Sequence, residues 1–242
     1  MVLLAGAVIT HTALAADSFA DLRKVLQARY PEVKIVDIKP TPITGLYEVY
    51  TGDAIVYSND SGGFLVAGPL VDTRTRENLT ATSLDTRNAV DFSTLPLDKA
   101  IKTVKGTGVR KMAVFADPDC PYCKKLEHEL VSVNNVTIYT FLYPLEELHP
   151  DAKARARAIW CSSDRSQAWT KWIVDGKEPA AAPATCKQDP LAEMRALGVK
   201  LRVNSTPTLI FANGRRTSGA LEAAQLEQRL DAKKPGATSP GS

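Results

Sequence analysis

The sequence predicts two domains, a small α+β unit followed by an α/β domain that carries a helical insertion. Two observations support this prediction. Short segments rich in β-branched and aromatic residues, separated by turn residues, fill the first third of the chain. Further along, a buried strand runs into the corner Cys120-Pro121-Tyr122-Cys123, and a helix follows. With 242 residues, the chain can bury a hydrophobic core in each domain.

Composition and charge argue against a nucleic-acid-binding protein and against a protein with a membrane-spanning helix. The formal net charge is +3 and no run of Lys or Arg stands out, so nucleic acid is not an expected partner. No apolar run reaches the roughly 18 residues expected of a membrane-spanning helix.

Residues 1–15, MVLLAGAVITHTALA, have the features of a signal peptide. The segment is apolar, carries no acidic or basic side chain and ends in Ala13-Leu14-Ala15, a small-x-small cleavage pattern. We expect the mature chain to begin near Ala16 and to be exported; the alternative is a buried N-terminal helix. Export would place the four cysteines in a compartment where disulfides persist.

Residues 16–75 are expected to form a small α+β domain. An amphipathic helix at 17–31 is followed by β-rich runs at 33–40, 46–52, 54–58 and 64–72. A unit of about 60 residues buries only about 60% of its chain surface and is marginal alone. An edge strand, which the Gly-Pro within 64–72 favours, could pair with a second copy. We therefore predict a homodimer held by this dimerisation domain.

Residues 76–106 are interpreted as a linker between the two domains. Its first part, 76–94, is polar and lacks strand periodicity. The segment 95–106, LPLDKAIKTVKG, predicts a helix with Leu97, Ile101 and Val104 on one face, ended by Gly106.

Residues 107–232 show the element order of a thioredoxin fold with an insertion. Strands are expected at 111–117 and 136–143, with a helix at 120–133 between them, and a long helical stretch fills 151–176. A hairpin at 205–219 and a closing helix follow, and residues 233–242 are expected to be a disordered tail.

The corner at Cys120 has the chemistry of a redox couple. With Cys120 at the N-cap, Pro121 occupies the first helical position, where proline is favoured. Unpaired backbone N–H groups and the helix dipole then favour a thiolate and lower the cysteine pKa from about 8.5 to roughly 3.5–7.5. Cys123 lies one turn further and is more shielded. Cys120 is therefore the expected nucleophile and Cys123 the resolving thiol.

Two alternatives exist for these cysteines, a zinc knuckle and a structural staple. Zinc needs two further ligands at short spacing, whereas His128 and His149 are 21 residues apart and no second CxxC exists. A three-residue loop makes a poor staple. We expect neither a metal nor another cofactor.

Cys161 and Cys186 are expected to form a structural disulfide. Their bond would close a loop of about 25 residues, worth roughly 3–4 kcal/mol in the chain-entropy model, and would hold the helical insertion. Two unpaired buried thiols are the alternative.

The segment Asn204-Ser205-Thr206-Pro207-Thr208 is expected to complete the site. A cis Pro207 before the strand would bring the backbone of Thr206 close to Cys120, where it could bind an extended client segment. An ordinary strand-start proline is the alternative.

With these residues in place, the chain resembles the DsbC/DsbG family of bacterial periplasmic disulfide isomerases. The resemblance runs from about Asp17 to the last helix and rests on FADPDCPYCKKL, AIWCSSD, PATC, ALGVKLRVNSTPTLIFANG and GPLVD. It implies a cystatin-like N-terminal dimerisation domain, a helical linker and a thioredoxin domain in a V-shaped dimer. It also implies that Cys120 is the nucleophile with Cys123 as its partner, that Thr206-Pro207 is the cis-proline motif and that a membrane reductant of the DsbD type keeps the site reduced.

Two features of the corner depart from a simple match. The dipeptide Pro121-Tyr122 is that of DsbG, whereas DsbC carries Gly-Tyr, so the clients could be exported proteins with wrong disulfides or with single oxidised cysteines. Asp117 and Asp119 could raise the thiolate pKa, although we interpret them as solvated loop residues. Other hypotheses are a DsbA-like oxidase, which would not need the N-terminal unit, and a chaperone in which the thiols are secondary.

Overall fold

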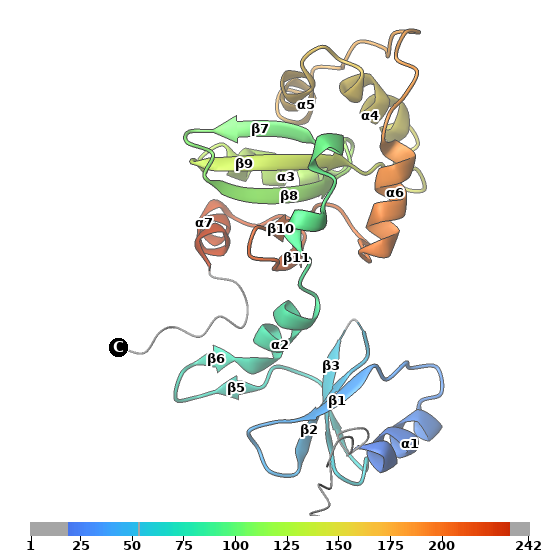
Figure 1. Cartoon of the computed structure of the whole chain (residues 1–242), viewed down its shortest axis with the longest axis vertical. Coiled ribbons are helices and arrows are strands. Elements are labelled where there is room, and N and C mark those ends of the chain that lie inside the picture. The colour runs from blue at the N-terminus through green and yellow to red at the C-terminus, as the bar shows by residue number, and fades with distance from the viewer. Residues whose placement is uncertain (1–18, 53, 233–242) are drawn as a thin grey trace, which may run out of the picture. The chain divides into compact units, whose positions relative to one another are not determined.

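The computed structural model describes residues 19–52 and 54–232 (Figure 1). The expected signal peptide and C-terminal tail lie outside these ranges. The chain divides into two compact units, and the boundary in sequence falls between Leu84 and Asp85. Within the described ranges, no helix is long and apolar enough to cross a membrane.

The first unit is a helix packed on an antiparallel meander. Helix α1 spans Ala20–Arg29, and the four-stranded sheet has the order β1-β2-β3-β4. The strands are β1 (Asp37–Pro40), β2 (Leu46–Tyr50), β3 (Ile55–Asn59) and β4 (Leu65–Val66). Leu22 and Leu26 of α1 are buried against the sheet, in a cluster with Ile35, Ile38 and Val49. The predicted helix and the first three predicted strands of this unit are confirmed.

Gly68-Pro69 interrupts the last predicted strand, as its sequence indicates. The chain leaves the short edge strand β4, and β5 (Val71–Asp72) pairs instead with β6 (Glu77–Asn78) in a separate two-stranded sheet. Helix α2 (Leu79–Arg87) follows, within the stretch that was interpreted as polar linker. The edge carries exposed apolar side chains, including Phe64 at 75% exposure.

The predicted helix at 95–106 is wrong. Its start forms a 3-10 turn at Leu97–Lys99, and Ile101–Lys105 form strand β7. This strand pairs antiparallel with β9 (Val136–Leu142), and Ile101 is buried while Val104 is 54% exposed. The β-branched residues Ile101, Thr103 and Val104 suit a strand, and the sheet pairing decides between two weak local preferences. The sheet of the second unit therefore begins before residue 107.

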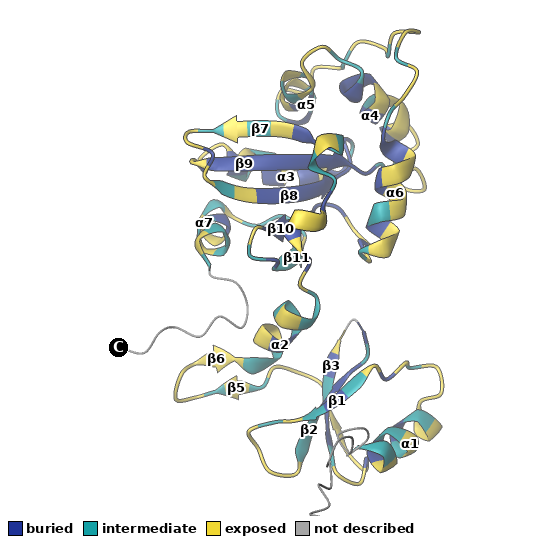
Figure 2. Ribbon diagram, viewed as in Figure 1, coloured by how far each residue is buried: buried dark blue, intermediate teal, exposed yellow. Residues whose placement is uncertain are grey.

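The second unit is built on a five-stranded sheet of order β11-β10-β8-β9-β7. Strand β8 (Arg110–Ala116) runs parallel to β9, and the hairpin β10 (Thr208–Phe211) and β11 (Arg216–Ser218) adds antiparallel. Helices α3 (Pro121–Leu130) and α7 (Ala223–Asp231) pack on one face, where Leu126, Leu130 and Leu226 join the core. The central strands are buried along most of their length (Figure 2).

The helical insertion consists of separate helices rather than one long one. Helix α4 spans Ala152–Trp160 and α5 spans Arg165–Ile173. The break occurs where Asp164 caps α5 by accepting a hydrogen bond from the Gln167 N–H at 2.9 Å. A further helix, α6 (Leu191–Lys200), was not predicted; it packs its Met194 into the core on the other face of the sheet.

Candidate active site

The cysteine corner lies at the carboxyl end of the central strand β8, as predicted. Cys120 is the N-cap of α3 with extended backbone angles, and Pro121 begins the helix. The backbone N–H of Cys123 donates to the Cys120 carbonyl at 3.0 Å. Tyr122, between the two cysteines in sequence, is 63% exposed.

The two thiols differ in pKa in the direction that the sequence predicts. The pKa of Cys120 is lowered to about 5, chiefly by a hydrogen bond from the Cys123 thiol. Burial opposes this effect, while the Thr206 side chain and the backbone N–H groups of Cys123 and Tyr122 add to it. The pKa of Cys123 is raised, chiefly by burial and to a smaller extent by the hydrogen bond to Cys120 and its charge. At neutral pH the site therefore holds one thiolate and one thiol.

The exposures of the two cysteines agree with these roles. Cys120 is 6% exposed and Cys123 is 1% exposed, so both are buried and Cys120 is the less shielded of the two. Both are unbonded thiols in this structure.

The Thr206-Pro207 peptide bond is cis, as predicted. It lies directly before β10 and faces the corner, because Cys120 Sγ is 3.3 Å from the carbonyl oxygen of Thr206. These residues are 86 positions apart in sequence, and the pairing of β10 with β8 brings them together.

Asp117 and Asp119 are not solvated loop residues, so that interpretation is wrong. Asp117 is completely buried and accepts hydrogen bonds from the N–H groups of Asp119 and Leu145, both at 2.7 Å, and from His149. Asp119 forms an ion pair with Arg155 of α4. Both partners, His149 and Arg155, lie more than 30 positions downstream, so no local pattern in the sequence could reveal them.

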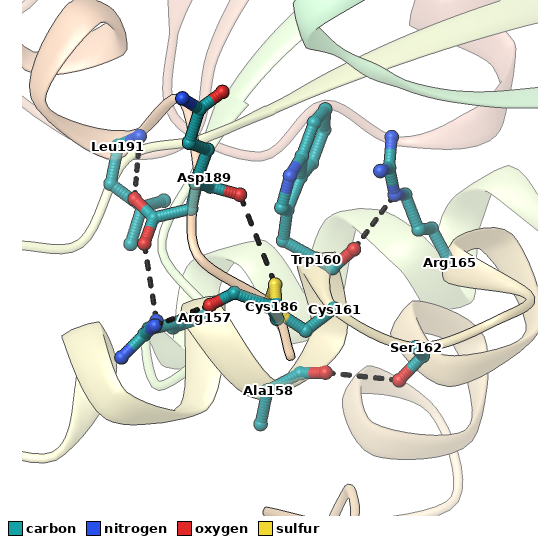
Figure 3. Close-up of a disulfide and its surroundings, with 10 residues drawn as sticks. Arg157, Ala158, Trp160, Cys161, Ser162, Arg165, Cys186, Asp189 and Leu191 are labelled. Carbon is teal, nitrogen blue, oxygen red and sulfur yellow. Dashed lines mark hydrogen bonds and ion pairs between the residues drawn. A yellow bond between two sulfur atoms is a disulfide. The ribbon is translucent and has the colours of Figure 1, made fainter. Parts of the chain in front are cut away.

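The second pair of cysteines forms the predicted disulfide (Figure 3). Cys161 follows the last residue of α4, Cys186 lies in the loop before α6, and their Cα atoms are 5.8 Å apart. Arg157 of α4 donates to the Cys186 carbonyl at 2.6 Å and pairs with Asp189 at 3.3 Å. The bond thus fastens the long loop of the insertion to α4.

The described residues offer no group of three or more His, Cys, Asp or Glu side chains that could hold a metal ion.

Comparison with known proteins shows which family this chain resembles in sequence. A family model described as a disulfide bond isomerase N-terminal domain matches residues 13–81, and one described as a thioredoxin-like domain matches residues 97–234. A probable thiol:disulfide interchange protein DsbC of Bordetella avium is 46% identical over 209 residues, which cover 86% of this chain and 73% of the relative. The chain belongs to the DsbC/DsbG family.

Two further similarities extend this result. The thiol:disulfide interchange protein DsbC of Escherichia coli K12 is 30% identical over 208 residues, which cover 82% of each chain. A crystal structure of a disulfide interchange protein from Neisseria gonorrhoeae is 48% identical and covers 56% of this chain and 96% of its own, with a TM-score of 0.54. The predicted fold class and the predicted enzyme class of the DsbC/DsbG family, a thiol–disulfide oxidoreductase, are confirmed.

Proposed function

We propose that this protein rearranges wrong disulfides in exported proteins through a Cys120 thiolate. The observation that carries the proposal is the difference between the two cysteines. Cys120 has its pKa lowered to about 5 and is the more exposed, while Cys123 is buried with a raised pKa. A thiolate and a protected thiol one helical turn apart suit attack followed by resolution.

The first step is attack of the Cys120 thiolate on one sulfur of a client disulfide. A bond forms between Cys120 Sγ and that sulfur, the client disulfide breaks, and the other client sulfur leaves as a thiolate. A second client thiolate can then attack the client sulfur of this mixed disulfide. That step forms a new client disulfide and returns the Cys120 thiolate, so the cycle needs no net oxidant or reductant.

Cys123 resolves the mixed disulfide when no client thiol completes the cycle. Its sulfur attacks Cys120 Sγ, releases the client as a thiol and leaves a Cys120–Cys123 disulfide, while the Cys123 proton passes to the departing sulfur. The client is reduced by two electrons and the enzyme is oxidised. A membrane reductant of the DsbD type would then restore both thiols.

Client binding is assigned to the residues around Cys120. The contact between Cys120 Sγ and the Thr206 carbonyl oxygen supports this role, because an extended client segment could pair with that backbone during the mixed-disulfide step. Pro207 fixes this conformation, Pro121 starts the helix, and the exposed ring of Tyr122 offers apolar contact to a client.

Three other functions fit the chain less well. The relatives from Bordetella avium and Escherichia coli are named DsbC, which favours rearrangement over the DsbG-like reduction of single oxidised cysteines. A DsbA-like oxidase would not need the N-terminal unit, which matches an isomerase N-terminal domain. A chaperone with secondary thiols would keep its full cellular role after replacement of both Cys120 and Cys123 by Ser.

We place the protein in the periplasm as a homodimer held by residues 16–75. The signal-peptide pattern at 1–15 and the disulfide between Cys161 and Cys186 support export. The short apolar edge strand β4 supports pairing of two copies.

Alkylation trapping of Cys120 and Cys123 in cells tests the proposal. An isomerase must carry a reduced nucleophile, so both thiols should be trapped mostly free. A mostly oxidised pair would instead support the oxidase.

A further inference from the structure

Asp119, the residue immediately before Cys120, carries a carboxylate of which only one oxygen is paired. Its side chain is 15% exposed, and its Oδ1 is buried without a hydrogen-bond partner among the described residues. Burial raises the pKa of this carboxyl, and Arg155 opposes that rise. A negative charge beside Cys120 disfavours a thiolate there, because two like charges at one site compete for protons.

Arg155 of α4 supplies the compensating charge. Its Nη1 donates to Asp119 Oδ2, and its Nε donates to Glu178 Oε1 at 3.0 Å. The guanidinium carbon lies 4.2 Å from the centroid of the Trp172 ring. The Arg155 side chain is only 16% exposed, so solvent and salt screen this ion pair less than a surface pair.

Helix α5 fixes the same corner from a second direction. The indole Nε1 of Trp172 donates to the carbonyl of Pro118 at 2.7 Å, and its ring stacks on Arg155. The two residues before Cys120 are therefore both held by the helical insertion. Burial and several directed contacts restrict the positions that Arg155 can take.

We propose that Arg155 is a positioning residue for Cys120, which holds and neutralises Asp119 so that this carboxylate does not compete with the thiolate. This inference rests on the proposed function, in which Cys120 is the nucleophile. Because a guanidinium stays protonated throughout the working pH range, the compensation is constant with pH. Cys123 on α3 contacts Cys120 directly, and His149 after β9 senses the charges of both Cys120 and Asp119. The other charged groups linked to Asp119 are Asp117 after β8, Arg155 on α4 and, through Arg155, Glu178 after α5.

The consequence is a more stable reduced enzyme. A stabilised thiolate stabilises the dithiol form and makes the Cys120–Cys123 disulfide easier to reduce. Loss of Arg155 should therefore raise the pKa of Cys120 and shift the equilibrium with glutathione toward the disulfide.

The ultraviolet absorbance of the Cys120 thiolate, measured against pH, tests the inference. Each variant is made in the full chain that also carries Cys123→Ser, so that Cys120 is the one titrating thiol of the pair. Arg155→Met should raise the pKa of Cys120 by about one pH unit or more. Arg155→Lys keeps a cation and should restore most of the parent value. Arg157→Met is the matched control, because Arg157 lies on the same helix but pairs with Asp189 and contacts the Cys186 carbonyl instead.

Replacement of the Asp119 carboxylate distinguishes a charge effect of Arg155 on the Cys120 pKa from an effect of lost structure. Asp119→Asn leaves the Arg155 cation near Cys120 and should lower the pKa below the parent value. The double variant Arg155→Met/Asp119→Asn should return close to the parent. Because Asn has nearly the shape of Asp, Asp119→Asn tests the same charge even if Arg155→Met does not fold.

Two results would overturn the inference. They are an unchanged Cys120 pKa in Arg155→Met, or a rise that persists in the double variant. A parent whose Cys120 titrates at or above about 8.5, the ordinary cysteine value, would instead contradict the proposed function itself.

Discussion

His149 Nδ1 lies 3.0 Å from Oδ2 of Asp117, a carboxylate that is completely buried. This hydrogen bond raises the pKa of His149, and the charges of Asp117, Cys120 and Asp119 act in the same direction. Because the folded-state pKa is raised, the pair stabilises the fold fully below the unfolded pKa of about 6.5. That contribution is lost as pH rises through the folded-state pKa.

The first prediction concerns His149→Gln. At about pH 6 the variant should be less stable than the parent by about 1 kcal/mol, because a charged hydrogen bond is removed. The difference should shrink toward about pH 9, because the imidazole loses its charge as pH rises through its folded-state pKa. Urea unfolding at the two pH values measures it, and His128→Gln, at an exposed position on α3, is the control. A difference that is the same at both pH values contradicts the assignment.

The second prediction concerns the hydrogen bond between the two thiols. Because the Cys123 thiol is the main cause of the low Cys120 pKa, its removal should raise that pKa. Cys123→Ser keeps a donor, so Cys120 should still titrate well below about 8.5. Cys123→Ala has no donor, and its Cys120 should titrate about one pH unit higher than in the serine variant. Thiolate absorbance against pH measures both, and equal values in the two variants would refute the prediction.

The third prediction concerns the disulfide. Replacing Cys161 and Cys186 with Ala should lower the free energy of unfolding by roughly 3–4 kcal/mol, because a loop of about 25 residues is released in the unfolded chain. The Cys120 pKa should stay near its parent value, since the bond lies in the insertion rather than at the corner. Denaturant unfolding and thiolate titration measure the two effects. A double variant as stable as the parent, yet inactive, would show that the structural role is wrong.

The parts of the site that the sequence predicts are those set by local chemistry. A proline after Cys120 favours a helix start. Pro207 indicates a cis bond only in combination with the CxxC corner and the thioredoxin-like order of elements, so both features could be predicted without a structure. Strand β7 and the partners of Asp117 depend on distant segments. The first requires pairing with β9, and the second requires a loop that folds back after that strand. Local periodicity does not contain this information.

The fourth prediction concerns the two units. Val90 and Phe92 are buried in the core of the second unit, so a chain beginning at Thr94 would lose part of that core. A chain beginning at Asp85 should fold, be monomeric and exchange small disulfides, but isomerise a scrambled protein poorly. Sedimentation and an isomerisation assay measure this. A shortened chain that remains dimeric, or that isomerises at the full rate, contradicts the assignment of residues 16–75 to dimerisation.

The central claim is that the Cys120 thiolate carries the isomerisation and that Cys123 serves only as its resolving thiol. The most direct test compares Cys120→Ser and Cys123→Ser on a ribonuclease with scrambled disulfides, with mixed disulfides trapped by acid quenching. Cys120→Ser should be inactive and form no mixed disulfide, whereas Cys123→Ser should accumulate a mixed disulfide through Cys120 and keep part of the isomerisation rate. Full activity in Cys120→Ser, or a mixed disulfide formed through Cys123, would contradict the account.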